Sequence, residues 1–338
     1  MSDYLKALQK IGQIFSKDKN DFLELTATIN QYKNIVEALS SVNIGDKHNK
    51  ENLYFNNGKA LGTTWAAMCL DDILRTKQFI TGIFKAIETL QKKQQKPIHI
   101  LYAGTGPYAT LLLPILASFS PNEVKVTLVE INKESFNNMK HVIHKLGLDN
   151  HVFRYENEDA TTLKINPDLP VHIIVSETLQ CGLVKEQQVP ITLNLLHQVE
   201  NNVILIPEML ALDVCLFNHN NFTNRNENTK EETYLQVLDR LIEINNSSNE
   251  AFKLNTVPTV TTILSEKKIT INPNDATTFD ALVLVTRMTI FQDITIDLNQ
   301  SGLTVPIILD VISNYKEEKT FTISYKIDSE PGFVMHWL

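Results

Sequence analysis

Between Pro97 and Pro207, short apolar runs alternate with segments of helical spacing, and this alternation is the strongest constraint on the fold. The runs are IHILYA, VKVTLVE, HVFRYE, HIIVSE and NVILIP, and the helical segments are 107–119, 133–146 and 186–200. Strands that alternate with helices in this way form a parallel sheet with helices on both faces. We therefore predict an α/β unit over residues 96–206.

The residues before this unit are predicted to be mainly helical. Between residues 3 and 40, apolar side chains recur every three or four positions, which indicates amphipathic helices. A longer helix is expected over residues 64–93. The stretch 41–58 is polar and rich in Asn and Gly, which is typical of a mobile connection. Residues 1–95 are thus expected to form a helical N-terminal segment.

After Pro207 the pattern changes to alternating apolar runs, which are LALDVCLF, VTTILSE, KKITI, DALVLVTRMTIF and TFTISYKI. Alternation of this kind predicts antiparallel strands with one buried face. A helix is expected at 232–245, where apolar side chains form a stripe between polar flanks. Residues 207–338 are therefore expected to form an antiparallel β domain.

Composition and charge exclude several classes of protein. Of 338 residues, 43% are hydrophobic and 21% are charged, which is typical of a globular chain with a full core. The formal net charge of −8 argues against a nucleic-acid partner, because binding a phosphate backbone requires a clustered Lys/Arg surface. A neutral or cationic partner is easier to accommodate.

Cysteine content and hydropathy bear on the compartment. The three cysteines are widely separated, so no disulfide framework and no metal site is expected. The most apolar stretch, 97–119, contains glycines and prolines that exclude a membrane-spanning helix. Because the N-terminus lacks the pattern of a signal peptide, a cytoplasmic location without membrane association is expected.

A glycine turn, Gly104-Thr-Gly106-Pro107, follows the first strand of the α/β unit. Glycines at this position let a ligand approach the backbone, and Pro107 suits the first position of a helix. A tight strand-to-helix turn with only a structural role would have the same sequence.

Two acidic residues follow the next strands. Glu130 ends VKVTLVE, roughly 20 residues after the turn, where a carboxylate can accept hydrogen bonds from a ribose diol. Asp159 follows the third strand and would lie near an adenine amino group. Both carboxylates could instead cap local structure. Nicotinamide dehydrogenases share this arrangement, but their Tyr/Lys or His/Asp sets are not found here.

Two further glutamates flank a turn after the fourth strand. Glu186 follows Glu177 by nine residues, and Gly182 between them can form the turn. Two carboxylates in one pocket could pair with a guanidinium, fix its plane and stabilise its charge. Alternatively, Glu177 caps a helix and Glu186 is exposed on it.

Together these residues resemble the protein arginine methyltransferase family, and the GxGP turn is most similar to its symmetric-dimethylating (type II) branch. Ser176, Glu177 and Glu186 match the family's double-glutamate loop, which implies that the two glutamates are catalytic residues that hold the acceptor. Arg75 matches a basic residue that pairs with the carboxylate of the cofactor, S-adenosylmethionine.

The same resemblance implies the rest of the cofactor site and the architecture. Gly104, Gly106 and Glu130 match the turn and the ribose-binding acid, and Asp159 with Ala160 matches the adenine-contacting pair. The implied fold is a Rossmann-like methyltransferase domain followed by an antiparallel β-barrel-like domain, with a helical arm at 216–250 that supports a homodimer.

The chain departs from the family pattern at several positions. Tyr102 stands where many members have an acidic residue, and Tyr108 replaces the third glycine. No internal Thr-His-Trp sequence is present, and His336-Trp337 is the only His-Trp pair. Cys69 replaces a bulky Met or Phe that helps to set the extent of methylation, so the type of product is left open.

The resemblance thus implies an S-adenosylmethionine-dependent methyltransferase that N-methylates a guanidino group of a small molecule, peptide or protein. One alternative is a small-molecule N- or O-methyltransferase of specialised metabolism on the same scaffold. The other alternative is a non-catalytic, methyltransferase-like scaffold that binds a partner through its β domain.

Overall fold

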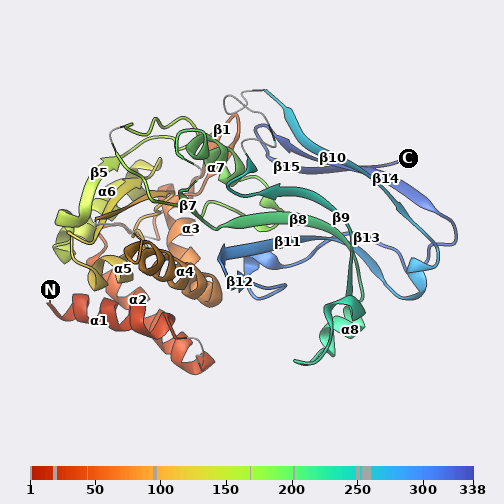
Figure 1. Cartoon of the computed structure of the whole chain (residues 1–338), viewed down its shortest axis with the longest axis horizontal. Helices are drawn as coiled ribbons and strands as arrows, with labels where there is room; N and C mark the ends of the chain where they lie inside the picture. Colours follow the sequence, from red (N-terminus) through yellow and green to blue (C-terminus); the bar gives the residue numbers. More distant parts are fainter. Residues whose placement is uncertain are drawn as a thin grey trace.

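The computed structural model of the chain describes residues 2–17, 21–43, 45–93, 97–167, 169–200, 202–248, 252 and 260–338 (Figure 1). The first residue of the expected N-terminal segment, its boundary at 95 and 96, and the end of the expected arm at 249–250 lie outside these residues.

The predicted parallel sheet is confirmed. Its strands are β3 (Ile98–Ala103), β4 (Val124–Val129), β5 (Val152–Glu156), β6 (Ile173–Ser176) and β7 (Ile204–Ile206). Their order is β5-β4-β3-β6-β7, and every neighbouring pair is parallel. The chain runs outward from β3 to β5 and then returns to place β6 on the other side of β3. Ligands of open α/β sheets bind at such a reversal, outside the carboxyl ends of the strands.

Strand β3 shows why this sheet forms, since its six side chains are all buried. Ile98, Ile100 and Tyr102 face a core that also contains side chains of the helices α4 (Ile73–Gln91), α5 (Leu113–Ser118) and α6 (Lys133–Leu146). Leu101 and Ala103 face the opposite core, beside α7 (Gln188–Leu196). A strand covered on both faces reads as a continuous apolar run, as it does here.

The N-terminal helices lie outside this layer. They are α1 (Ser2–Phe15), which packs on α5, and α2 (Phe22–Leu39), which packs on α6 (Figure 1). The next elements are β1 (Leu53–Phe55), β2 (Gly58–Ala60) and α3 (Thr63–Met68). Short 3-10 turns occur as η1 (His48–Lys50), η2 (Cys69–Asp71), η3 (Asp149–His151), η4 (Cys181–Leu183), η5 (Glu231–Thr233), η6 (Asp275–Thr277) and η7 (Gly302–Thr304).

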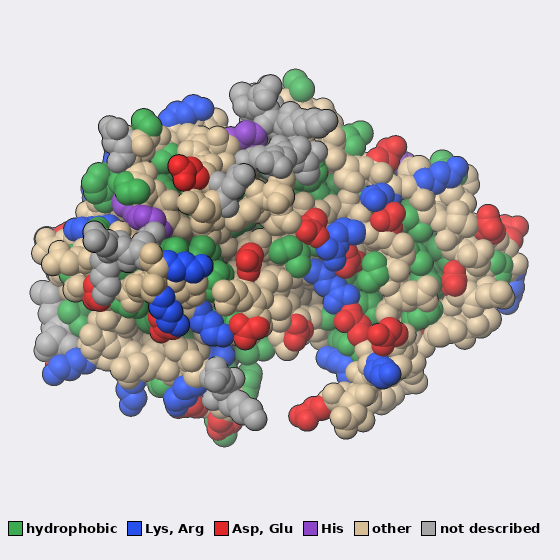
Figure 2. Space-filling view, viewed as in Figure 1, with side chains coloured by type: hydrophobic (Ala, Val, Ile, Leu, Met, Phe, Trp, Pro, Cys, Tyr) green, Lys and Arg blue, Asp and Glu red, His purple; other side chains and the backbone are tan. Residues whose placement is uncertain are grey.

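The C-terminal part consists of two antiparallel sheets, as predicted. The first contains β8 (Met209–Phe217), β9 (Leu235–Ile244), β11 (Ala281–Phe291), β12 (Ile294–Ile296) and β13 (Ile307–Val311). The second contains β10 (Thr262–Ile271), β14 (Lys319–Ile327) and β15 (Gly332–Trp337). On the face shown in Figure 2, acidic and basic side chains are interspersed over both parts of the molecule.

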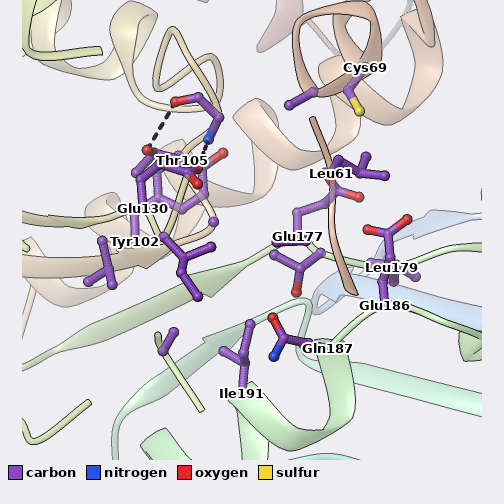
Figure 3. Close-up of a pocket in the computed structure, with 18 of the residues that line it drawn as sticks. Leu61, Cys69, Tyr102, Thr105, Glu130, Glu177, Leu179, Glu186, Gln187 and Ile191 are labelled. Carbon is purple, nitrogen blue, oxygen red and sulfur yellow. Dashed lines mark hydrogen bonds between the residues drawn. The ribbon is translucent and has the colours of Figure 1, made fainter. Parts of the chain in front are cut away.

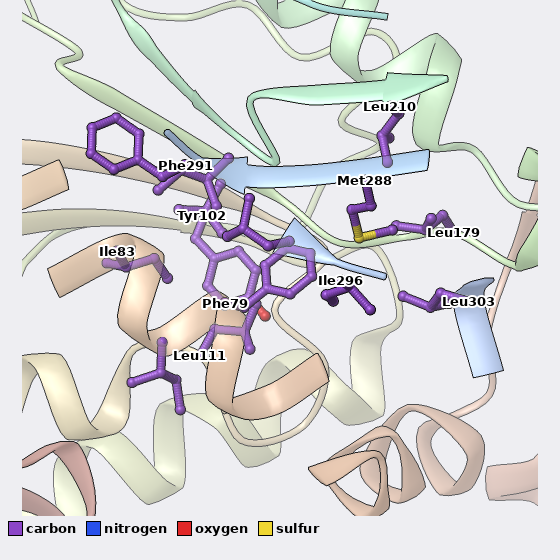
Figure 4. Packing of buried hydrophobic residues seen from close by; sticks show 14 of the residues in the cluster. Phe79, Ile83, Tyr102, Leu111, Leu179, Leu210, Met288, Phe291, Ile296 and Leu303 are labelled. Carbon is purple, nitrogen blue, oxygen red and sulfur yellow. The ribbon is translucent and has the colours of Figure 1, made fainter. Parts of the chain in front are cut away.

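A continuous apolar core joins the two parts of the molecule (Figure 4). Phe79 and Ile83 of α4 contribute to it, and Met288 and Phe291 contribute from β11. The helix approaches the strand so closely that a Cβ atom on Gly82 would lie 2.5 Å from Ile290. The α/β part and the β part are thus packed as one unit, and the start of α4 has a fixed place relative to both.

The predicted helix at 232–245 is wrong, because this segment is mainly strand β9. Its pairing with β8 contains irregularities after Leu212 and after Val214, which interrupt the usual alternation of buried and exposed side chains. The interrupted alternation mimics the spacing of a helix. A short helix, α8 (His219–Thr223), projects from this sheet instead (Figure 1). The homodimer stays a prediction without the support of the longer helix.

Three other expectations are corrected. The helix expected over 64–93 is divided at Asp72, which leaves the helical conformation and caps α4. The helix expected to begin at Pro107 begins at Leu113, because residues 107–112 form turns and Ala109 has a φ of 49°. The stretch 41–58 is not merely a connection, since it contains the η1 turn and β1, which pairs with β2.

Candidate functional site

A pocket opens at the carboxyl ends of β3, β4 and β6 (Figure 3). The open space between its walls, counted out to its mouth, is about 920 Å³. All of the residues predicted from sequence line it, namely Arg75, Gly104, Gly106, Glu130, Asp159, Ala160, Glu177 and Glu186. Figure 3 shows Glu130 at one end of the view and Glu186 at the other, with Glu177 between them.

The glycine turn forms one wall of this pocket. Gly104 and Gly106 have φ angles of +77° and +62°, which side chains rarely adopt. A Cβ atom on Gly104 would also lie 2.2 Å from Cγ2 of Thr178, so the glycine is required by space as well as by conformation. The turn therefore presents bare backbone to the pocket.

Glu130 is bound to this turn by its carboxylate. Its Oε2 accepts a hydrogen bond of 2.8 Å from the backbone N–H of Gly106 (Figure 3). Its Oε1 accepts one of 2.8 Å from the backbone N–H of Asn132. The residue is 7% exposed, and burial raises the pKa of its carboxyl to about 7, against the opposing effect of these hydrogen bonds. Its charge therefore changes around neutral pH.

Asp159 and Ala160 lie on the adjacent turn after β5. Asp159 Oδ1 accepts a hydrogen bond of 2.8 Å from the N–H of Thr161, so the capping role is present in addition to the position in the pocket wall. Asn194 of α7 holds the turn from below by donating a hydrogen bond of 2.8 Å to the carbonyl of Ala160. A helix on one face of the sheet thus supports this wall.

Arg75 and Glu177 form an ion pair in the pocket, which the sequence does not predict. Their side chains are 11% and 6% exposed, and the pair uses Nη2 of the arginine and Oε2 of the glutamate. Glu177 Oε1 is buried and has no hydrogen-bond partner among the described residues. Because a guanidinium has five N–H donors, Arg75 can bind a second anion while it holds Glu177.

The start of α4 gives Arg75 its position. Asp72 caps this helix by accepting a hydrogen bond of 3.1 Å from the N–H of Arg75. The other oxygen of Asp72 accepts hydrogen bonds from the Ser301 hydroxyl (2.6 Å) and the Gly302 N–H (3.1 Å). A loop of the β domain therefore fixes the helix end that carries Arg75.

The loop between Glu177 and Glu186 brings both carboxylates to the pocket. Gln188 accepts hydrogen bonds from the N–H (2.9 Å) and hydroxyl (3.1 Å) of Thr178, which joins the two ends of the loop. Gly182, with a φ of +75°, forms the expected turn. Glu186 is only 6% exposed, so the alternative in which it lies on the surface is wrong.

The β domain holds this loop from outside. The Gly182 N–H donates to the Thr286 hydroxyl (2.9 Å), and the Tyr325 hydroxyl donates to the Leu183 carbonyl (2.7 Å). Burial raises the pKa of Glu186, while the positive charges of Lys59 and Arg75 oppose this effect. A carboxylate with a raised pKa is a better proton acceptor than one in water.

Three further residues line the pocket that the sequence had not assigned to the site. Tyr102 lines it and is buried, and burial raises the pKa of its hydroxyl. Lys59 lies on the β1–β2 hairpin, which the Asn56-Asn57 turn followed by Gly58 could have indicated, because Asn and Gly favour tight turns between strands. Cys69, which stands where members of the resembled family have a bulky Met or Phe, lies in the pocket wall.

The C-terminal His336-Trp337 pair lies outside this wall. Both residues belong to β15, and Trp337 packs on the ring of Phe321 with centroids 5.2 Å apart. The pair therefore extends the second sheet, and neither residue lines the pocket described here.

The described residues contain neither a candidate metal cluster nor a candidate membrane-spanning helix. No group of three or more His, Cys, Asp or Glu side chains there could hold a metal ion. None of the described helices is long and apolar enough to cross a membrane.

No protein-family model and no curated protein matches the chain, but solved structures do. The alignment with a crystal structure of PRMT6 with SAH covers 80% of this chain and 98% of the PRMT6 chain, at 12% identity and a TM-score of 0.52. Another PRMT6 crystal structure covers 80% and 97%, at 11% identity and a TM-score of 0.50. The chain has a PRMT-like methyltransferase fold. A structure of the Trypanosoma brucei PRMT1 enzyme–prozyme complex with AdoHcy aligns at 15% identity and a TM-score of 0.48. The alignment covers 76% of this chain and 86% of that chain.

Proposed function

We propose that the protein transfers a methyl group from S-adenosylmethionine to a nitrogen of a guanidino group. The observation that carries this proposal is that one pocket contains both a wall of the kind that binds a nucleoside and a pair of buried carboxylates. The glycine turn with Glu130 forms the wall, and Glu177 and Glu186 form the pair. The similar PRMT6 crystal structure with SAH supports the choice of cofactor.

The residues present fit this cofactor. Gly104 and Gly106 leave room for it to approach the backbone, and Glu130 would accept hydrogen bonds from the ribose diol. Asp159 with Ala160 would contact the adenine, and Arg75 would pair with the carboxylate of the methionine part. When bound, the cofactor supplies an electrophilic methyl group on a sulfonium.

Glu177 and Glu186 would hold the acceptor at the other end of the pocket. The unpartnered Oε1 of Glu177 supports this role, because a buried carboxylate oxygen without a donor is costly unless a ligand supplies one. Held by these two carboxylates, the guanidino nitrogen would be oriented towards the methyl group that the bound cofactor would supply. Glu186, with its raised pKa, takes the proton that the nitrogen loses.

The turn also supports assignment to the symmetric-dimethylating (type II) branch, since Gly104-Thr-Gly106-Pro107 has the GxGP sequence of that branch. Cys69 stands where a bulkier residue limits methylation, and it lies in the pocket wall. Mass spectrometry of the product identifies the number of methyl groups and their symmetry.

Binding measurements test the cofactor. We expect the isolated protein to bind S-adenosylmethionine and S-adenosylhomocysteine but not NAD in calorimetry, because Arg75 accompanies the nucleoside wall. Tight binding of NAD with no response to either sulfur nucleoside would overturn the proposal. Turnover of labelled S-adenosylmethionine with guanidino compounds then distinguishes the enzyme from a non-catalytic scaffold, and methylation of other amines or hydroxyls alone would favour the small-molecule alternative.

Cofactor binding is expected to depend on pH through Glu130. Its pKa of about 7 means that the carboxyl becomes protonated below neutral pH and loses an acceptor for the ribose hydroxyls. The dissociation constant for S-adenosylhomocysteine should therefore fall as the pH rises from about 6 to about 8, by up to about tenfold. Glu130→Gln should bind more weakly and lose this dependence. Equal affinity of the wild-type protein across this range would contradict the assignment.

A further inference from the structure

Lys59 is a cation in the pocket that the proposed reaction does not use. It lines the pocket, is half-buried, and acts electrostatically on Glu186. Within the part of the chain that the structure describes, its ammonium group forms no hydrogen bond and no ion pair. Arg75, the other cation that acts on Glu186, is already paired with Glu177. Lys59 is therefore free to bind an anion that enters the pocket.

Backbone contacts place Lys59 beside Glu186. The Lys59 N–H donates a hydrogen bond of 2.8 Å to the Lys185 carbonyl, and Lys59 forms a parallel bridge with Glu186. Gln187, which directly follows the loop between Glu177 and Glu186 (the glutamate loop), also joins it to the hairpin. Its Nε2 donates a hydrogen bond of 2.7 Å to Asn57 Oδ1. The hairpin and the acceptor end of the pocket thus form one structure.

Close packing at Gly58 strengthens this connection. Its φ is +128°, and a Cβ atom there would lie 3.0 Å from both Gln187 Cγ and the Lys185 carbonyl oxygen. Glycine is therefore needed for the hairpin to approach the loop. Since Lys59 follows directly, its backbone has a defined position above the acceptor site.

The charges at this end indicate what an acceptor must carry. A guanidinium is attracted by Glu177 and Glu186, but it is repelled by the ammonium of Lys59 and by the sulfonium of the cofactor. An anionic group on the acceptor itself would pair with Lys59 and remove this repulsion. A guanidinium without such a group would leave the ammonium unpaired in a half-buried pocket.

We propose that Lys59 binds a carboxylate of the acceptor, and that the acceptor is a small guanidino acid in which guanidinium and carboxylate belong to one molecule. This inference rests on the proposed function. An arginine inside a peptide has neutral carbonyl groups where the free acid has its carboxylate. A neutral carbonyl pairs more weakly with an ammonium than a carboxylate does. The free acid is therefore the preferred substrate class.

A matched series of acceptors tests the inference in the full-length protein. The probes are 4-guanidinobutyrate, L-arginine, the two amides in which a neutral carboxamide replaces the carboxylate, and a peptide with an internal arginine and blocked ends, each with labelled S-adenosylmethionine. We expect kcat/KM for the acids to exceed that for the amides and the peptide by about tenfold or more. Equal turnover of acids, amides and peptide would overturn the inference but leave the proposed function intact. Failure to bind the cofactor or to methylate any guanidino compound would instead overturn the proposed function.

Variants of Lys59 identify the residue responsible. Lys59→Gln should lose most of the preference for the acids through an increase in KM, and Lys59→Arg should retain it, while both bind S-adenosylhomocysteine with wild-type affinity. Lys47→Gln is the matched control, because Lys47 is exposed, lies outside the pocket lining and carries the same charge. An unchanged preference in Lys59→Gln would overturn the inference. A loss of cofactor affinity in that variant would assign Lys59 to the cofactor and would also overturn it.

Discussion

Glu186→Gln and Glu177→Gln are each expected to reduce methyl transfer by about thirtyfold to several-thousandfold. Glutamine retains the size of the side chain and one acceptor oxygen but removes the negative charge. Both carboxylates are almost fully buried, so a charged hydrogen bond lost there costs about 2–5 kcal/mol. Steady-state rates with an identified guanidino acceptor measure the effect, and Glu200→Gln, an exposed site outside the pocket lining, is the control.

The two glutamates should not act independently. Because both side chains hold one group, the double variant should lose less activity than the product of the two single effects. Cofactor affinity should remain nearly unchanged, most clearly in Glu186→Gln, since Glu177 also contacts Arg75. Full activity of Glu186→Gln together with an inactive Glu177→Gln would contradict the double-glutamate assignment, and the guanidino hypothesis would fail with it.

The central sheet could be predicted from sequence because its strands are covered on both faces. Side chains of β3 pack alternately into two cores, so the strand is apolar throughout and differs plainly from the helices around it. The approximate location of the site followed from the same pattern. Residues that follow parallel strands meet at one edge of the sheet, and Gly104, Glu130 and Glu177 do so here.

Segments whose form depends on tertiary pairing were predicted less well. Strand β9 has the apolar spacing of a helix, and only its pairing with β8, including the irregularities after Leu212 and Val214, makes it a strand. Each strand of the β1–β2 hairpin has only three residues, so no periodicity marks it. Its place above the glutamate loop depends on contacts such as Gln187 with Asn57, between residues far apart in the chain.

The contacts between side chains in the site were likewise only partly predictable from the sequence. The family resemblance assigned Arg75 and Glu177 to one pocket but to different ligands, and the structure pairs them with each other. Such a pair depends on the position of α4, which packs against β11 and β12 of the β domain. The exact partner of a long, flexible side chain therefore requires the three-dimensional arrangement.

Arg75→Ala is expected to weaken binding of S-adenosylhomocysteine by about thirtyfold to several-thousandfold, which corresponds to about 2–5 kcal/mol. The guanidinium is nearly buried and is the cation that would face the carboxylate of the cofactor. Its removal also leaves Glu177 without its ion-pair partner. Repulsion between Glu177 and the carboxylate of the cofactor would then add to the lost attraction between that carboxylate and Arg75. Calorimetry on folded protein measures the effect, with Arg154→Ala as control, because Arg154 pairs with Glu156 outside the pocket lining.

A cycle with Glu177→Gln separates the two roles of Arg75. If the arginine binds both carboxylates, Arg75→Ala should weaken cofactor binding less in the Glu177→Gln background than in the wild type, because the repulsion from Glu177 is gone. If Arg75 served only to neutralise Glu177, the single variant would lose stability while the cofactor bound as before. An unchanged dissociation constant in well-folded Arg75→Ala would therefore remove Arg75 from the cofactor site and leave it as the structural partner of Glu177.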